Sequence, residues 1–284
     1  MRPPSARPKK RFGQHFLVSP TVLSGILRLA ELGPADTVLE IGAGTGVLTE
    51  ALAARARRVL ALELDRDLIS PLRQRFADRP HVEIIHADAL DFDLNSLDEA
   101  VKIVANLPYG TAVPILMRLL GAGSRWRVAV VMLQREVADR LRASPGTKAY
   151  GALTLTAQWQ AVIAKGFNVP PSAFSPRPTV MSTLVKVTPR ATPPVSVHNE
   201  ALLWKVVRAA FAQRRKMLVN ALAAGFQPWL TAGTLRDTLT QVGIEASRRG
   251  ETLGLAEFAR LADAILPLSL QKRTGCESGR GSPH

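Results

Sequence analysis

The most informative stretch of the sequence is Leu39-Glu40-Ile41-Gly42-Ala43-Gly44-Thr45-Gly46, where a short apolar run leads into glycines at every second position. Glycines at a strand-to-helix turn let the backbone approach a ligand closely and direct helix N-terminal amides at it. A dinucleotide-binding fingerprint would place Gly or Ala three residues after Gly44, where Val47 stands. With Glu40 just before the glycines, the spacing favours a small nucleoside ligand that has no pyrophosphate.

Outward from this loop, short apolar runs alternate with amphipathic segments. The predicted strands are Val38–Ile41, Val59–Leu62, Val82–Ile85, Val101–Ala105 and Val128–Leu133, and the predicted helices are about 47–57, 66–77, 111–121 and 134–142. Such alternation predicts an α/β domain with a doubly wound, mostly parallel sheet covered on both faces. Two later runs, about 160–169 and 180–187, have no helix between them, which predicts an antiparallel hairpin at the sheet edge.

The rest of the chain suggests a flexible arm, a second domain and a tail. Residues 1–11 are basic and Pro-rich, and Ser19-Pro20 is a helix-start signal for Thr21–Leu32. A Pro/Thr/Val-rich linker follows at about 189–197, and helical patterns then cover about 199–224, 232–242 and 255–265. We therefore predict a first domain over 12–188, a small all-α domain over 189–268 and a disordered tail over 269–284.

The composition points to a polyanionic partner. The formal charge of +14 favours nucleic acid, because each Lys or Arg on a phosphate releases counterions. An anionic membrane surface is the alternative, although no apolar run reaches the roughly 18 residues that span a bilayer. The single cysteine, Cys276, and five scattered histidines predict a reducing, cytoplasmic location and no metal site.

Two acidic residues follow successive predicted strands. Glu63 ends the second strand about twenty residues beyond the loop, where a carboxylate can accept both ribose hydroxyl protons. Asp88, in His86-Ala87-Asp88-Ala89, follows the third strand and can accept from an adenine amino group. Either acid alone is commonly just a solvated strand end. Their joint placement at the edge where open sheets bind ligands favours a nucleoside site.

The turn Asn106-Leu107-Pro108-Tyr109 follows the fourth predicted strand on the same edge. A Pro turn after a strand is often only structural. The adenine amine is a poor nucleophile because its lone pair is delocalised into the ring. Acceptors for both of its N–H groups, the Asn106 side-chain oxygen and the Pro108 carbonyl, would free that lone pair. Tyr109 is placed to stack on the base.

Several blocks recur in a fixed order between about Lys9 and Pro267. They are Lys10–Leu17 (KRFGQHFL), Glu40–Gly46, Asn106–Tyr109, Gln134–Ala138 (QREVA), Pro145–Gly151 (PGTKAYG), Phe167–Ser182 and Phe211–Leu218 (FAQRRKML). Single blocks occur in other methyltransferases, but the ordered set resembles the bacterial small-subunit ribosomal RNA adenine dimethyltransferase family.

The resemblance implies a Rossmann-like class I methyltransferase fold with a seven-stranded sheet, S-adenosylmethionine as methyl donor, and no metal. It also implies two methyl groups on each of two adjacent adenines near the 3′ end of 16S rRNA, in a small-subunit particle. The implied cofactor-binding residues are His15, Leu17, Gly42, Gly44, Glu63, Asp88, Ala89 and Asn106. The implied catalytic residues are Asn106, Pro108, Tyr109 and Phe174, with the adenine sandwiched between Tyr109 and Phe174.

Two of these residues have plainer interpretations. His15 stands where relatives often carry Asn, and a buried packing histidine is the alternative. Phe174, taken alone, would more often be a core residue. The chemistry itself needs only in-line positioning and electrostatic support, since the sulfonium donor carries its own leaving group and the methylated nitrogen can lose its proton to water.

A basic block, Arg208–Leu218, lies on a predicted helix of the second domain. A charge run of this length is usually a solvated face. Together with the arm at 2–11, it predicts a phosphate-binding surface that includes Arg214, Arg215 and Lys216. The helical domain would then select RNA by shape, while the pocket binds a base taken out of its stack.

Three rival functions stay open. A related 23S rRNA methyltransferase of the antibiotic-resistance type would tend to carry Ile at Leu107 and matches the basic block less well. A nucleotide-dependent oxidoreductase is disfavoured by the glycine spacing and the charge. A non-catalytic RNA-binding assembly factor is disfavoured by the intact Asn106–Tyr109 turn. We predict a monomer.

Overall fold

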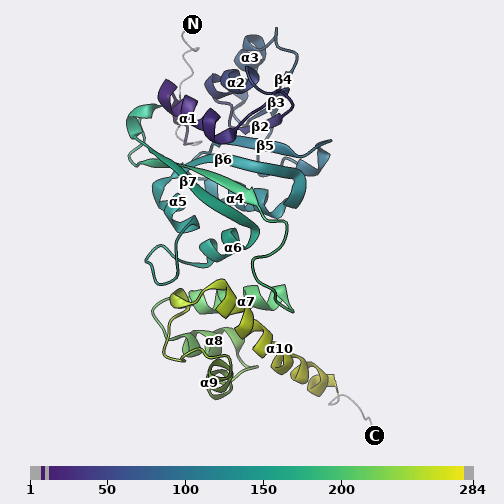
Figure 1. Ribbon diagram of the computed structural model, residues 1–284, viewed down its shortest axis with the longest axis vertical. Helices are drawn as coiled ribbons and strands as arrows, with labels where there is room; N and C mark the ends of the chain where they lie inside the picture. Colours follow the sequence, from purple (N-terminus) through teal and green to yellow (C-terminus); the bar gives the residue numbers. More distant parts are fainter. Residues whose placement is uncertain (1–7, 10–12, 278–284) are drawn as a thin grey trace. The chain divides into compact units, whose positions relative to one another are not determined.

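The computed structural model describes residues 8–9 and 13–277, so the predicted basic arm, apart from Pro8 and Lys9, lies outside the described residues. The described chain divides into two compact units (Figure 1). Unit 1 runs up to Arg142 and resumes over Gln160–Ala191, and unit 2 comprises Ala143–Trp159 and the residues from Thr192 onward. The sequence placed a single boundary near residue 189.

The segment before Gln160 belongs to unit 2 because it contributes to that unit's apolar core. Tyr150 and Trp159 are buried there, and the Tyr150 hydroxyl donates to the Leu253 carbonyl at 2.7 Å. These contacts join residues about a hundred positions apart in the chain, and a local hydrophobic pattern does not reveal them.

Unit 1 is built on one seven-stranded sheet in the order β4-β3-β2-β5-β6-β9-β7. The strands are β2 (Thr37–Ile41), β3 (Arg58–Glu63), β4 (Val82–His86), β5 (Val101–Asn106), β6 (Trp126–Gln134), β7 (Ala161–Val169) and β9 (Ser182–Pro189). The first five are parallel, and β9 runs antiparallel between β6 and β7. The predicted class I methyltransferase fold is confirmed, with the hairpin at the sheet edge and β7 outermost.

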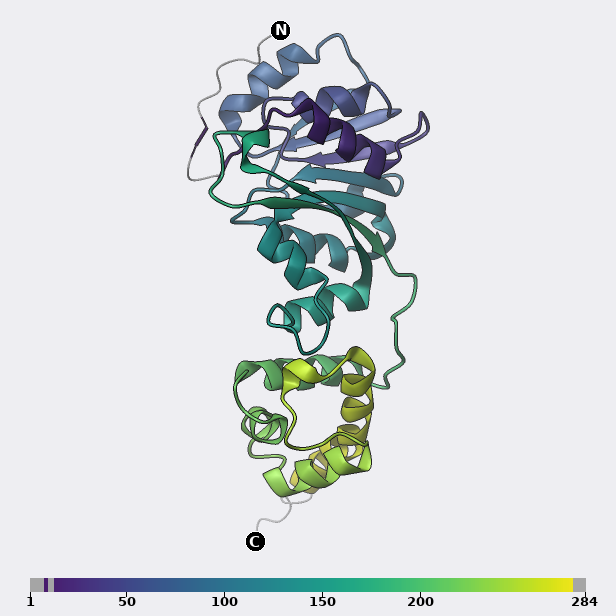
Figure 2. The ribbon, with the colours of Figure 1, turned by 60° about the vertical axis from the view of Figure 1, so that its left-hand side comes forward.

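Helices cover both faces of this sheet (Figures 1 and 2). They are α1 (Pro20–Ala30), α2 (Val47–Ala53), α3 (Arg66–Arg75), α4 (Ala112–Gly121) and α5 (Arg135–Leu141). One core cluster joins α1, α2 and α3 to alternate strand residues such as Val38, Val59 and Val104, because successive side chains of a strand point to opposite faces. As predicted, Ser19 caps α1: its hydroxyl accepts from the Val22 N–H, with Pro20 next in the chain.

A second, two-stranded sheet pairs β1 (Phe16–Leu17) with β8 (Phe174–Ser175) in antiparallel register. Two-residue strands carry no hydrophobic alternation, so the sequence pattern did not predict them. The Val18 N–H extends the pairing by donating to the Ala173 carbonyl at 2.8 Å. This pairing fixes the N-terminal segment beside the main sheet of unit 1.

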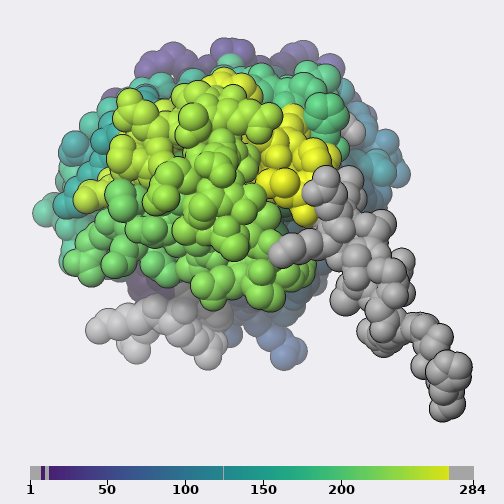
Figure 3. Space-filling model, turned by 90° about the horizontal axis from the view of Figure 1, so that it is seen from below, coloured from purple at the N-terminus to yellow at the C-terminus, as the bar shows by residue number. Residues whose placement is uncertain are grey.

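Unit 2 is helical, as the sequence predicted. Its helices are α6 (Ala152–Gln160, whose last residue belongs to unit 1), α7 (Glu200–Ala212), α8 (Leu218–Phe226), α9 (Ala232–Gln241) and α10 (Leu255–Glu277). In Figure 3 the yellow-green side chains of this unit form a continuous surface. α6 was not predicted, and the continuous helix predicted over 199–224 is wrong because the chain turns between α7 and α8.

The predicted tail over 269–284 is also partly wrong, because α10 continues to Glu277. Gln271, Lys272 and Arg273 all have good helix propensity, which fits a continued helix better than tail composition suggested. Residues 278–284 lie outside the described part of the chain. No helix among the described residues is long and apolar enough to cross a bilayer.

Candidate active site

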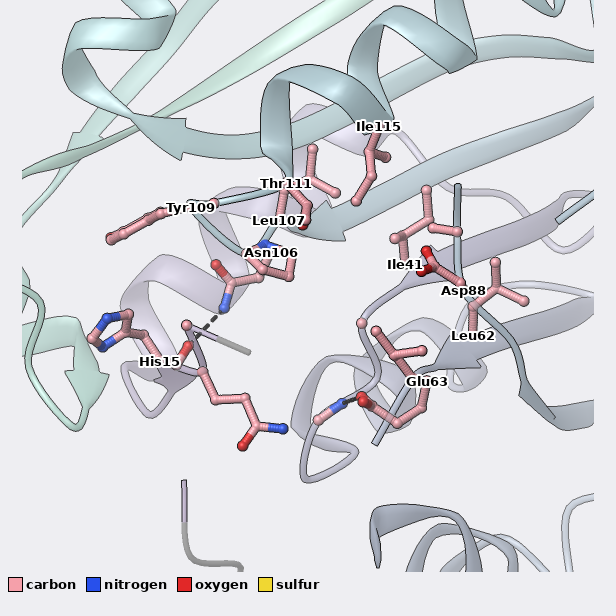
Figure 4. Close-up of a pocket in the computed structure, with 18 of the residues that line it drawn as sticks. His15, Ile41, Leu62, Glu63, Asp88, Asn106, Leu107, Tyr109, Thr111 and Ile115 are labelled. Carbon is pink, nitrogen blue, oxygen red and sulfur yellow. Dashed lines mark hydrogen bonds between the residues drawn. The ribbon is translucent and has the colours of Figure 1, made fainter. Parts of the chain in front are cut away.

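A cavity of about 310 Å³ opens in unit 1 at the carboxyl ends of β2, β3, β4 and β5 (Figure 4). Its walls are residues 13–16, Ile41, Gly42 and Gly44, together with 62–64, 87–89, 106–111 and Ile115. Residues that follow four different strands meet there because parallel strands end at one edge of a sheet. The predicted residues that line this cavity are His15, Gly42, Gly44, Glu63, Asp88, Ala89, Asn106, Pro108 and Tyr109.

The glycine loop needs glycine for two separate reasons. Gly42, Gly44 and Gly46 all have positive φ angles, of 82°, 58° and 79°, which L side chains rarely adopt. A Cβ at Gly44 would also lie 3.1 Å from the Phe16 ring, and one at Gly46 would lie 3.0 Å from Leu72. The absence of side chains in the loop therefore leaves space for Phe16, which lines the cavity, on one side and for Leu72 of α3 on the other.

Glu63 is held rigidly inside the cavity wall. It is 6% exposed, one carboxyl oxygen accepts from the Gly44 N–H at 2.7 Å, and the other accepts from the Asp65 N–H at 2.8 Å. Burial raises the pKa of Glu63, and the two backbone hydrogen bonds oppose that rise. Each oxygen keeps a second lone pair, so the carboxyl can still accept from two vicinal hydroxyls.

Asp88 lies beside a slot with apolar walls. Its Oδ1 accepts from the Leu90 N–H at 2.8 Å, which fixes the side chain and leaves the other oxygen for a ligand donor. Figure 4 shows Asp88 next to Ile41 and Leu62, with Ile115 above them. A flat, partly apolar ring with an amino group at its edge fits such a slot.

Asn106 presents its side-chain oxygen because its nitrogen is engaged elsewhere. The Asn106 Nδ2 donates to the His15 carbonyl at 2.9 Å, drawn as a dashed line in Figure 4. The Pro108 carbonyl accepts from the Thr111 N–H at 3.1 Å and retains one lone pair. Two acceptors therefore remain available in a turn that follows β5.

Tyr109 lies at the outer part of this turn. Its hydroxyl shares a 2.6 Å hydrogen bond with the Ser182 hydroxyl, and burial raises the pKa of Tyr109, so the phenol stays neutral. The ring centroids of Tyr109 and His15 are 5.3 Å apart. The hydrogen bond fixes the position of the phenol oxygen and with it the direction of the side chain.

The His15 imidazole is directed away from Glu63 and towards Tyr109 (Figure 4). Its Nδ1 lies 2.8 Å from the Pro176 carbonyl. Because a carbonyl oxygen only accepts, Nδ1 carries the proton in this contact. The family resemblance implies that His15 contacts the methyl-donor cofactor. A contact from the imidazole ring to that cofactor would have to use Nε2.

Leu17 and Phe174 do not line the cavity. They are 5% and 2% exposed and belong to the core under α1, α2 and α3, because the β1–β8 register pairs them with each other. The stacking role predicted for the Phe174 ring is therefore not seen in this arrangement. Phe16, the neighbour of Leu17, lines the cavity instead.

Glu40 is buried beneath the glycine loop and is not part of the cavity wall. It is 0% exposed, and burial, with a smaller contribution from the charge of Glu63, raises its pKa to about 8. Its carboxyl is thus a neutral acid at neutral pH. In the sequence Glu40 was only part of the loop pattern, and the structure gives it a place in the core below the loop.

The basic block of unit 2 begins on α7, but its charged residues 214–216 lie in the turn between α7 and α8 and not on a helix. Arg214 is tied down, since it pairs with Glu251 at 2.7 Å and donates to the carbonyls of Lys148 and Tyr150. These bonds hold the Arg214 side chain in the turn between α7 and α8. Arg215 and Lys216 are exposed in the same turn.

This open, mostly parallel sheet, with its glycine loop, buried strand-end glutamate and acceptor-bearing turn, defines a class I methyltransferase. The sequence model of the family described as "Ribosomal RNA adenine dimethylase" matches residues 6–260. The chain belongs to that family, and it is an S-adenosylmethionine-dependent rRNA adenine dimethyltransferase.

Individual relatives agree with this membership. The chain is 44% identical to the "Ribosomal RNA small subunit methyltransferase A" of Moorella thermoacetica, covering 91% of this chain and 92% of that one. Among solved structures it resembles a dimethyladenosine transferase from Plasmodium falciparum, with 26% identity, a TM-score of 0.76 and coverage of 90% and 98%. It also resembles the 23S rRNA methyltransferase ErmE, with 25% identity, a TM-score of 0.68 and coverage of 88% and 99%.

Proposed function

We propose that this enzyme dimethylates the N6 amines of two adjacent adenines near the 3′ end of 16S rRNA, as a monomer acting on a small-subunit ribosomal particle in the cytoplasm. The main support for the small subunit is sequence identity. The chain is 44% identical, over nearly its full length, to a protein named for the small subunit, but only 25% identical to the 23S rRNA methyltransferase ErmE. The runner-up is therefore methylation of 23S rRNA.

The cavity fits S-adenosylmethionine through its own residues. Glu63 would accept from the ribose hydroxyls, the backbone at Gly42 and Gly44 would contact the amino-acid end, and Asp88 with Ala89 would hold the adenine edge. When bound, the donor supplies a methyl group on a sulfonium that departs as a thioether. A buried carboxyl with free lone pairs in the wall is the feature of this cavity that calls for a hydroxylated ligand.

The acceptor adenine would meet the Asn106–Tyr109 turn. The Asn106 oxygen and the Pro108 carbonyl would accept from the two amine protons, which concentrates the lone pair on nitrogen. The Tyr109 ring would support the face of the base. Phe174 would join only after leaving the core, so we assign it no stacking role in the described arrangement.

Glu63→Gln is expected to raise the Kd for S-adenosylhomocysteine about 30-fold, equivalent to about 2 kcal/mol, because one charged acceptor for the ribose becomes an amide donor. Isothermal titration calorimetry measures this directly. The matched control is Glu136→Gln on α5, an exposed glutamate paired with Arg140, for which we expect an unchanged Kd. A Glu63→Gln Kd within threefold of wild type would remove Glu63 from the donor site.

The exposed pair Arg215 and Lys216 would contact RNA phosphates, while Arg214 has a structural role through Glu251. Replacing both Arg215 and Lys216 with Ala is expected to reduce the slope of log affinity against log salt by about 1.5, at roughly 0.7–0.9 per phosphate contact. RNA binding across a salt series measures the slope. Arg236→Ala, an exposed arginine on α9, is the control. An unchanged slope in the double variant would contradict a phosphate contact.

The experiment that tests the function supplies labelled S-adenosylmethionine and compares small and large ribosomal subunits that lack the modification. We expect label on small-subunit RNA, on two adjacent adenines located by primer extension. Label on large-subunit RNA alone would favour the 23S alternative. A protein that binds small subunits without transferring label would be an assembly factor.

A further inference from the structure

The four residues Gly13–Phe16, which we call the strap, form one wall of the cavity and connect its two halves. They precede the first helix, so no strand of the main sheet holds them. Side-chain and backbone contacts at each end fix the strap. One end contacts Asn106 of the proposed acceptor site, and the other contacts residues with no role in the reaction described above.

At the donor half of the site, Gln14 anchors the strap to the start of α3. Gln14 Nε2 donates to Asp65 Oδ2 at 3.1 Å, and Gln14 Oε1 accepts from the Lys9 N–H at 2.8 Å. Lys9 Nζ also pairs with Asp65 Oδ1 at 2.5 Å. Both polar ends of the Gln14 amide are therefore satisfied in one orientation only.

Asp65 does not line the cavity, but it is bonded to Glu63, which does. It is 2% exposed, its side chain caps α3 by accepting from the Asp67 N–H, and its own N–H donates to Glu63 at 2.8 Å. Burial alone would raise the pKa of Asp65, but the hydrogen bonds from Lys9 and Gln14 lower it below its ordinary value. Asp65 thus stays ionised and links the strap to the proposed ribose-binding carboxyl.

At the acceptor half, the strap holds Asn106. The His15 carbonyl accepts from Asn106 Nδ2 at 2.9 Å, and that bond leaves the Asn106 oxygen free for the adenine amine. The two ends of the Asn106 amide have nearly the same shape. The His15 carbonyl is what makes one orientation better than the other.

We infer that Gln14 and Asp65 are positioning residues: together they hold the strap so that its wall closes the donor cavity and its His15 carbonyl orients the Asn106 amide. This inference rests on the proposed donor and acceptor sites. In this inference the Gln14–Asp65 pair contacts neither substrate. The four residues of the strap couple the donor half of the site to the acceptor half.

The polarity of the Gln14–Asp65 bond offers a sharp test. Gln14→Glu sets two carboxylates against each other, and Asp65→Asn sets two amide nitrogens against each other. The double variant restores one donor facing one acceptor. An Asn at position 65 still caps α3, because Asn and Asp are equally good N-caps, and the Lys9 N–H still has an oxygen to bond at position 14. Asp65→Asn also removes the charge that faces Lys9 Nζ, but the double variant shares that loss, so the recovery of the double variant relative to Asp65→Asn alone reports on the Gln14–Asp65 hydrogen bond.

We expect each single variant to raise the Kd for S-adenosylhomocysteine about tenfold and to lower kcat at saturating donor about tenfold. The double variant should return both quantities to within about threefold of wild type. The fall in kcat is the informative readout, because loss of donor binding alone would not lower turnover once donor saturates. Asp67→Asn is the control: its carboxylate is 74% exposed and also pairs with Lys9, yet it does not touch the strap, and both values should stay within twofold.

The outcomes separate this inference from the proposed function. Single-variant effects that simply add in the double variant, or an unchanged kcat in both singles, would overturn the positioning role. Melting temperatures within a few degrees of wild type would show that the effects are local. If Glu63→Gln loses donor affinity while the Gln14 and Asp65 variants behave as wild type, the donor site stands and the strap inference falls. If wild type binds no S-adenosylhomocysteine, the donor site itself is wrong.

Discussion

Asn106→Ala is expected to lower kcat at saturating donor about 10³-fold, a loss of about 4 kcal/mol of transition-state stabilisation, while the fold stays intact. The Asn106 oxygen would accept a hydrogen bond that strengthens as the amine becomes pyramidal, so its loss falls on the chemical step. Single-turnover methylation of small-subunit particles at saturating donor measures this rate. A rate within tenfold of wild type would show that amine activation does not depend on Asn106.

Asn106→Asp provides the matched control for this prediction. It keeps an oxygen at the amine-facing position but replaces the nitrogen that donates to the His15 carbonyl with a second oxygen. We expect an intermediate rate, because the acceptor is present but its orientation is no longer fixed. A rate as low as that of Asn106→Ala would mean that orientation matters more than the acceptor, and a wild-type rate would mean that the His15 contact is dispensable.

The central parts of the site were predictable because they depend on one geometric rule. Gly42, Glu63, Asp88 and Asn106 each follow a different buried run, and parallel strands deliver their carboxyl ends to one edge. Once the alternation of strands and helices was recognised, their convergence followed without any knowledge of side-chain positions. The cavity lined by all four confirms that step.

Features that depend on long-range contacts were not predictable in the same way. The β1–β8 register buries Leu17 and Phe174, and it joins residues more than 150 positions apart through strands of two residues each. The Gln14–Asp65 bond likewise spans 51 positions. A local pattern cannot distinguish these contacts from chance.

The basic block is a place where long-range contacts accompany a break in a helical pattern. Residues 199–224 have helical spacing throughout, and most of that range is helical. The bonds from Arg214 to Glu251 and to two carbonyls hold a turn where the pattern continued a helix. Of the three predicted RNA-binding residues, this leaves Arg215 and Lys216 exposed for a partner.

Glu40→Gln is expected to stabilise the protein increasingly as pH rises from about 4.5 to about 8. Burial, and secondarily the nearby charge of Glu63, raises the pKa of Glu40 from 4.5 to about 8 in the folded state. The facing hydroxyl and backbone N–H of Thr49 lower that pKa without reversing the shift, and neither Glu40 carboxyl oxygen reaches full hydrogen-bond geometry within the described part of the chain. Glu40 therefore stays protonated in the fold at a pH where the unfolded chain has already lost the proton.

The sign of the effect follows from proton counting. Below pH 4.5 both states hold the proton and Glu40 costs no stability. Between pH 4.5 and 8 the unfolded state binds fewer protons, so the free energy of unfolding falls with rising pH, by about 5 kcal/mol in total at about 1.4 kcal/mol per pH unit. Above pH 8 the loss is constant. The Gln side chain does not ionise, so a variant carrying it escapes this loss whatever fixed cost its amide adds.

Urea unfolding of wild type and Glu40→Gln at pH 4.5, 6 and 8 measures the difference, and its growth with pH matters more than its value at any one pH. Glu83→Gln is the control, because Glu83 lies exposed on β4 and pairs with Arg58. We do not expect the difference in unfolding free energy between this variant and wild type to grow with pH. A Glu40→Gln difference that stays flat from pH 4.5 to 8 would mean that the glutamate is ionised beneath the loop. Two buried negative charges would then lie side by side at Glu40 and Glu63, and some cation would have to balance them.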